Sequence, residues 1–108
     1  MTFHIKNLGY GQLPAAKGTL YTVPVGISTI IKTVNYVNTC SVVGMTVNLF
    51  VCPSGNTSKY IIPPNLFLST RYSLIYNDEM TLGPGDLIEG DATSATTVDY
   101  EIWGVEES

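Results

Sequence analysis

The sequence predicts an all-β fold, an antiparallel β-sandwich of jelly-roll type with about seven or eight strands. Short runs rich in β-branched and aromatic residues alternate with Gly- and Pro-containing turns along most of the 108 residues. No run carries an apolar stripe at helical spacing for more than two turns. Only 13% of the residues are charged while 44% are hydrophobic, which predicts a surface poor in charge that either meets other protein or is simply polar and uncharged.

The first 18 residues are expected to form an extended N-terminal arm, with a single folded domain at 19–108. This segment holds three glycines and a proline and shows no sustained hydrophobic period. Its apolar residues are candidates for ordering on a neighbouring subunit, and the alternative is an arm that stays unbound. These candidates are Phe3, Ile5, Leu8, Tyr10 and Leu13.

The first predicted strands precede and follow Pro24. Residues 19–23 end at this proline, which has no N–H to donate to a neighbouring strand. After a Val-Gly turn, residues 28–38 form a longer strand whose inward residues are expected to be Ile30, Val34 and Tyr36.

The clearest alternation lies in residues 45–51, which are followed by the turn sequence Cys-Pro-Ser-Gly. In this strand Val47, Leu49 and Val51 are expected to share a face. The remaining strands are expected at 59–62, at 67–76 as one long or two short strands, at 85–92 and at 96–106. The inward residues of the last strand are expected to be Val98, Tyr100 and Ile102.

The cysteines and the single histidine predict no metal site. Cys40 and Cys52 lie twelve positions apart without a CxxC spacing, and His4 is far from both in sequence. The N-terminal residues lack the basic start and apolar run of a signal peptide, so free thiols in a reducing cytoplasm are expected. No apolar run reaches the roughly 18 residues that a membrane helix needs.

The acid-rich segment 78–91, DEMTLGPGDLIEGD, is interpreted as the bend of a β-hairpin. Pro84 presets φ and Gly85 can adopt the positive φ of a type II turn, so the turn itself explains these residues. Calcium binding and a glycosidase carboxylate pair are the alternatives, but apolar residues interleave the acids. We expect no catalytic residue, cofactor or metal, and therefore no enzyme.

Charge is divided along the chain, with all five basic residues at 1–77 and all nine acidic residues at 78–108. A bipolar subunit suits packing of acidic against basic faces, although a division in sequence need not be one in space. The spread of the bases excludes a dense nucleic-acid stripe. The candidate acidic contact face is Asp78, Glu79, Asp86, Glu89 and Asp91, and the basic one is Lys6, Lys17, Lys32, Lys59 and Arg71.

The seven tyrosines and one tryptophan have two readings. They could form a carbohydrate platform, with Trp103 beside Tyr60 or Tyr72 and with Asn48 or Asp99 as acceptors for sugar hydroxyls. The favoured reading is packing within the sheets, with hydroxyls at the rim, for Tyr36, Tyr72, Tyr76 and Tyr100.

Four segments carry a family resemblance: GTLYTVPVGISTIIKTVNYVNT, TVNLFVCPSG, LGPGDLIEGDA and VDYEIWGVEES. Over roughly residues 18–108 the chain resembles small β-sandwich accessory virion proteins of tailed bacteriophages. The resemblance implies a structural protein of the virion, made in the host cytoplasm. It favours a capsid decoration (cement) subunit that stabilises the lattice of the major capsid protein as a homo-oligomer, with a trimer favoured. The alternative is a tail, head-fibre or adaptor component with a receptor- or glycan-binding role.

Overall fold

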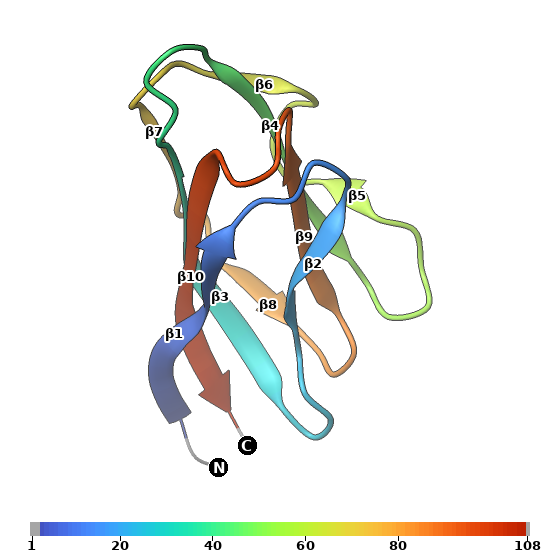
Figure 1. Ribbon diagram of the computed structural model, residues 1–108. Helices are drawn as coiled ribbons and strands as arrows, with labels where there is room; N and C mark the ends of the chain where they lie inside the picture. The colour runs from blue at the N-terminus through green and yellow to red at the C-terminus, as the bar shows by residue number, and fades with distance from the viewer. Residues whose placement is uncertain (1–2, 108) are drawn as a thin grey trace.

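The computed structural model describes residues 3–107, apart from the side chain of Lys6, and confirms the all-β sandwich. Two five-stranded antiparallel sheets pack face to face (Figure 1). The ten strands of this part of the chain are β1 (Phe3–Gln12), β2 (Gly18–Thr22), β3 (Ser28–Asn38), β4 (Met45–Cys52), β5 (Lys59–Tyr60), β6 (Leu66–Leu68), β7 (Ser73–Tyr76), β8 (Met80–Leu82), β9 (Leu87–Ala92) and β10 (Val98–Glu107).

Each sheet is organised around one long strand that pairs with two short ones. The first sheet has the order β1-β10-β3-β7, and β8 pairs with the other half of β3. The second sheet has the order β2-β9-β4-β5, and β6 also pairs with β4. β1 is therefore one edge of the first sheet, with β7 and β8 at the other, and β2 is one edge of the second, with β5 and β6 at the other.

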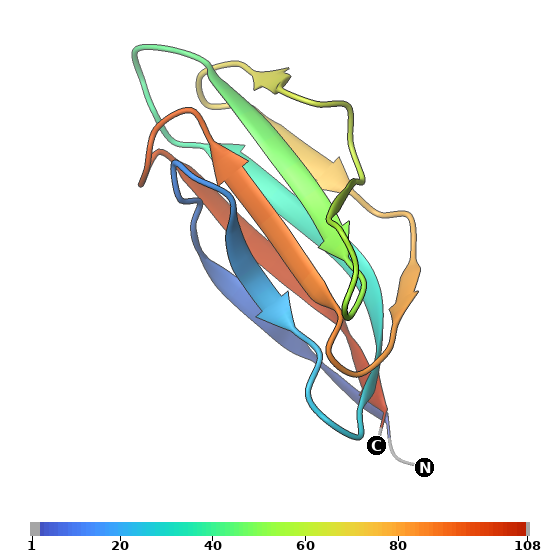
Figure 2. The ribbon, with the colours of Figure 1, turned by 90° about the vertical axis from the view of Figure 1, so that its right-hand side faces the viewer.

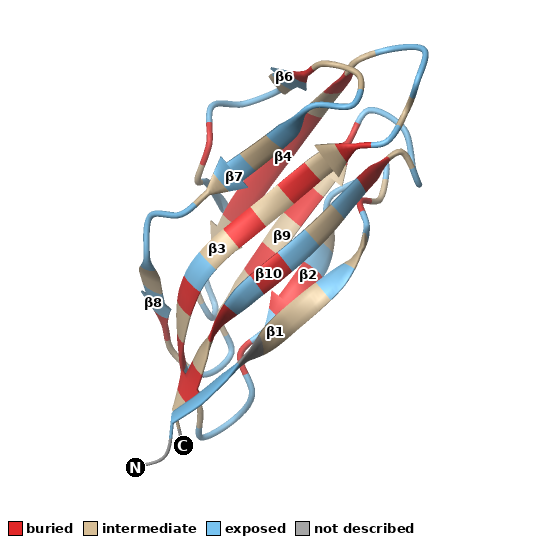
Figure 3. Ribbon diagram, turned by 90° about the vertical axis from the view of Figure 1, so that its left-hand side faces the viewer, coloured by how far each residue is buried: buried red, intermediate tan, exposed pale blue. Residues whose placement is uncertain are grey.

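The core lies between the sheets and follows the alternation of the long strands. Figure 3 shows buried and more exposed residues alternating along β3 and β10. The side chains of Val47 and Leu49 are fully buried, as are those of Val98 and Ile102, so the predicted inward faces of β4 and β10 are confirmed there.

Tyr36 crosses the core instead of ending at the rim, which corrects the favoured reading for this residue. Its side chain is 1% exposed, and its hydroxyl donates to the peptide oxygen of Asn48 on the opposite sheet at 3.0 Å. Burial raises the pKa of this phenol well above its usual range.

A β-bulge in β3 explains why the inward residue is Ile31 and not Ile30. Thr33 pairs with Trp103 and Ile31 pairs with Gly104, so Lys32 is an extra residue on β3. An extra residue reverses the side-chain phase, so Thr29 and Ile31 are buried before the bulge and even-numbered residues are buried after it.

The predicted N-terminal arm is instead part of the sandwich. β1 pairs with β10 from Phe3 to Gln12, and Leu13 is 1% exposed with its N–H bonded to Val98 O at 2.8 Å. The register of β1 against β10 shifts between Asn7 and Gly9, where the Asn7 Oδ1 accepts the Gly9 N–H at 2.9 Å. This irregularity interrupts the alternation of inward and outward side chains, so the sequence of β1 shows no strand period.

The molecule is elongated, with principal extents of 47 × 27 × 20 Å. Figure 2 shows the two termini and the β2–β3 loop at one end, and the loops at 39–44 and 93–97 at the other. Within residues 3–107 no helix has the length and apolar character needed to cross a membrane.

Candidate functional site

The described residues contain no group of three or more His, Cys, Asp or Glu side chains that could hold a metal ion. Cys40 and Cys52 are free thiols, and both are half-buried instead of buried. Hydrogen bonds from the peptide groups of Val43 and Val42 lower the pKa of the Cys40 thiol. The described residues therefore offer surfaces and not a reactive cluster as candidate sites.

The acid-rich segment contains the predicted turn but does not form a hairpin. Asp86 N–H bonds Gly83 O at 3.1 Å and Gly85 has φ of +85°, as a type II turn requires. However, β8 before the turn belongs to the first sheet, whereas β9 after it belongs to the second. The segment is a corner that carries the chain between the sheets, because the partners of β8 and β9 are different strands.

The carboxylate of Asp86 joins two turns at this corner. It accepts the Gly83 N–H at 2.9 Å and the Ser54 N–H of the β4–β5 turn at 2.8 Å. Asp86 therefore has a structural role within the chain, whereas the sequence analysis grouped it with the neighbouring acids as a candidate contact residue.

Replacing Gly85 by valine is expected to lower the free energy of unfolding by about 1–3 kcal/mol. A β-branched residue resists the positive φ, and a Cβ at this position would lie 2.9 Å from the Ser54 hydroxyl oxygen. The control is Gly83→Val, because a Cβ on Gly83 meets only an Asp86 oxygen at 4.0 Å. Urea denaturation followed by fluorescence measures both, and equal losses would show that the φ of Gly85 is not the cause.

The five candidate acidic residues do not form one face. Asp78 and Glu79 adjoin β8 at the first sheet, whereas Asp86, Glu89 and Asp91 lie in or next to β9 of the second. Four of them bond within the chain: Asp86 with two peptide N–H groups, Glu79 with Lys32 Nζ at 2.6 Å, Glu89 with the Ser58 hydroxyl, and Asp91 with Asn48 Nδ2 at 2.7 Å. Their role in contacts between subunits stays a prediction.

The candidate basic residues are also dispersed. Lys32 pairs with Glu79, so one member of the basic set binds one member of the acidic set. Lys17 bonds the Ser58 hydroxyl at 3.1 Å and lies over the Phe50 ring, with its Nζ 5.2 Å from the ring centre. Lys59 lies in β5 and Arg71 in the β6–β7 turn with positive φ. Lys6 lies in β1, and its side chain is outside the described part.

A buried polar cluster links the sheets near the end that holds the termini. The Tyr21 hydroxyl of β2 donates to Glu106 Oε2 of β10 at 2.7 Å and lies 2.8 Å from the Thr29 hydroxyl of β3. Burial is the main reason that the pKa of Tyr21 rises to about 12, and the Glu106 carboxylate adds to the rise. The cluster is enclosed, so it holds the sheets together and offers no surface for a ligand.

Exposed apolar side chains occur at both ends of the molecule. We use "distal apolar end" for Val42, Val43, Phe67 and Tyr72, whose side chains are 51–82% exposed. The Phe67 ring covers Gly44, while Asn38 bonds the peptide oxygens of Val43 and Tyr72, so these residues surround the end of β3. We use "terminal apolar end" for Phe3, Ile5 and Val25, which are 59%, 86% and 96% exposed.

The arm candidates are thereby divided. Phe3, Ile5 and Tyr10 are exposed, Leu8 is half-buried against the core, and Leu13 belongs to the core. Leu13 is therefore not a contact residue of the folded subunit.

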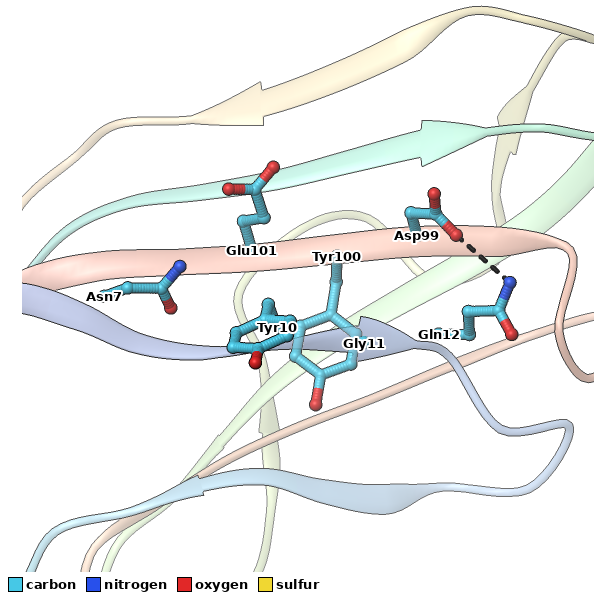
Figure 4. A pocket seen from close by; sticks show the side chains of 7 residues that line it. All are labelled: Asn7, Tyr10, Gly11, Gln12, Asp99, Tyr100 and Glu101. Atoms are coloured by element: carbon cyan, nitrogen blue, oxygen red, sulfur yellow. Dashed lines mark hydrogen bonds between the residues drawn. The ribbon is translucent and has the colours of Figure 1, made fainter.

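An open hollow of about 440 Å³ lies along β1 and β10 in the first sheet. Its lining combines aromatic, amide and carboxylate side chains, and the side chains described there include no Lys, Arg or His. Figure 4 shows the two carboxylates on β10 and the neighbouring side chains on β1, with Gln12 Nε2 donating to Asp99 at 3.3 Å. The lining residues are Asn7, Tyr10, Gly11, Gln12, Asp99, Tyr100 and Glu101.

The aromatic pairs predicted for a carbohydrate platform are not formed. Trp103 lies on β10, whereas Tyr60 lies on β5 of the other sheet, with its ring centre 4.7 Å from that of Phe50. Trp103 pairs with Thr33, while Tyr72 bonds Asn38, five residues and about 17 Å farther along β3. Asp99 does line the hollow, and the lining also includes Tyr10, which the sequence assigned to the arm.

Comparison with known proteins gives only distant likenesses. No family model matches the chain, and no curated protein matches it. Two solved structures of a pentameric capsid protein isolated from metagenomic phage sequences align over 93% of this chain. Their identities are 14% and 12%, with TM-scores of 0.36 and 0.32. The chain spans 61% and 62% of the length of those two proteins.

Proposed function

We propose that this chain is a structural virion protein of a tailed bacteriophage, most simply a capsid decoration subunit that cements the lattice of the major capsid protein. The observation that carries the proposal is the placement of exposed apolar side chains at both ends of an elongated sandwich. The sequence resemblance described above supports the same role.

Single exposed apolar residues are ordinary on a soluble protein, but grouped ones mark contact surfaces. The distal apolar end groups four large side chains around the end of β3. A subunit 47 Å long with such a group at one end and three exposed apolar residues at the other can bridge two neighbours.

The sparse charge of the chain favours burial in such joints. Only 13% of the residues are charged, so few charged side chains lose their hydration when an interface buries the surface. A standard protein–protein interface buries roughly 1,600 Å² and requires no reactive group. This surface can therefore stabilise a capsid lattice without a catalytic site or a cofactor.

Virions with and without this subunit are expected to release their DNA at different temperatures, the subunit-free particles at the lower one. Particles carrying the Val42→Ser, Val43→Ser double variant should resemble the subunit-free particles. Ile75→Ser is the matched control, because Ile75 is 61% exposed but lies on β7, outside both apolar ends. The measurement is dye-detected DNA release during heating. Identical release temperatures with and without the subunit would refute cementing.

Copy number separates this role from that of a tail, head-fibre or adaptor component. Hundreds of copies per particle favour a decoration subunit, whereas a few to a few dozen favour a fibre or adaptor. Quantitative mass spectrometry of purified virions gives the number. Sedimentation equilibrium of the purified protein tests the trimer that we favour.

A further inference from the structure

We propose that the hollow along β1 and β10 binds a neutral carbohydrate. This inference goes beyond cementing, since a sugar site on the sheet face can operate in a decoration subunit or a fibre subunit alike.

The strand register brings the polar and aromatic side chains of the hollow together. Tyr10 pairs with Glu101 and Gln12 pairs with Asp99, and paired residues of antiparallel strands project to the same face of a sheet. Asp99 and Glu101 are exposed while Val98 and Ile102 are buried, so this is the outer face of the sandwich.

Aromatic surface is available on two sides of Glu101. Tyr10 lies across from it on β1 and is 76% exposed. Trp103 lies two residues farther along β10, about 7 Å away on the same face, and is 44% exposed. The apolar face of a pyranose ring can stack on either aromatic ring while its hydroxyls remain within reach of Glu101.

The polar groups match hydroxyls better than ions. Carboxylates accept hydrogen bonds from hydroxyl groups, and the amides of Asn7 and Gln12 can donate as well as accept. Asp99 and Glu101 form no ion pair with any side chain that the structure describes. The described lining holds two carboxylates and no basic residue, so sialic acid and other anionic sugars are repelled. A volume of about 440 Å³ falls in the range of small-molecule sites.

The test begins with purified protein on an array of neutral and sialylated oligosaccharides. The neutral oligosaccharide with the strongest signal is then titrated into ¹⁵N-labelled protein. Shifts in amide resonances are expected to concentrate at residues 7–12 and 99–103. Tyr10→Ala and Glu101→Gln are each expected to weaken binding about tenfold. The matched controls, Tyr60→Ala on the second sheet and Asp78→Asn outside the hollow, are expected to bind like the parent.

Three results would overturn the proposal. The first is no binding of any neutral oligosaccharide, and the second is binding that Tyr10→Ala leaves unchanged. The third is a preference for arginine methyl ester, which would identify the hollow as a receptor for a cationic side chain of another protein. The amide spectra confirm that each variant is folded. Because the assay uses the free subunit, its failure leaves the virion heating experiment unaffected.

Discussion

Asn38→Ala is expected to destabilise the subunit by about 3–5 kcal/mol, a large share of the stability of a domain of this size. The Asn38 side chain is fully buried at the end of β3. Its Nδ2 donates to Leu68 O at 3.0 Å and to Ser69 O at 3.2 Å, and its Oδ1 accepts the Cys40 N–H at 2.9 Å. Alanine would leave these backbone groups buried without their partner.

The matched control is Asn35→Ala on the same strand. The Asn35 Oδ1 is buried and has no hydrogen-bond partner among the described residues, so its loss should cost far less. Urea denaturation of both variants gives the comparison. Similar losses would mean that the Asn38 hydrogen bonds contribute little. If Asn38→Ala does not fold at all, Asn38→Asp at a pH low enough to keep its carboxyl group protonated, with one acceptor and one donor, should retain part of the stability.

Gly104→Ala is expected to lower the free energy of unfolding by more than about 3 kcal/mol or to prevent folding. A Cβ on Gly104 would lie 2.3 Å from the peptide oxygen of Ile30 and 2.9 Å from a methyl carbon of Leu8. The first contact is with backbone, so relief requires β3 to move away from β10 in the middle of the first sheet.

The control for Gly104→Ala is Gly83→Ala, where the added methyl group has room. Thermal melting and the yield of soluble protein measure both. If Gly104→Ala melts like the parent, the close approach of Ile30 to Gly104 is not a constraint on the fold. Gly90→Ala provides an intermediate case, because the atoms nearest its added carbon belong to the Tyr36 and Leu20 side chains.

The long strands were predictable because their alternation is local information. β3 has the predicted bounds, and β4 differs from prediction by a single residue at its end. The phase within β3 was not predictable, because the bulge at Lys32 depends on how β10 pairs with it. β8 has only three residues and lies among acids, so its pairing with β3 left no pattern in the sequence.

The surface was less predictable than the core. The division of charge along the sequence suggested one acidic and one basic face. The pairing of β8 with β3 instead brings Glu79 of the acidic set next to Lys32 of the basic set. The hollow was missed for a similar reason. Tyr10 and Glu101 come from opposite ends of the chain, and the bulge near Asn7 concealed that β1 is a strand. The sequence does contain the tyrosine and the carboxylates, but only the register of β1 against β10 brings Tyr10 next to Glu101.

The pairing of β1 with β10 also determines when the first sheet can be completed during synthesis. Of the ten described strands, β1 is synthesised first and β10 last, yet Phe3 lies opposite Glu107 in the finished sheet. Until β10 emerges, β1 and β3 have no strand between them, and the apolar residues of β1 are open to other chains. The first sheet therefore cannot close until β10 has been synthesised, and crowded nascent chains on one messenger would be most prone to pair with each other through β1.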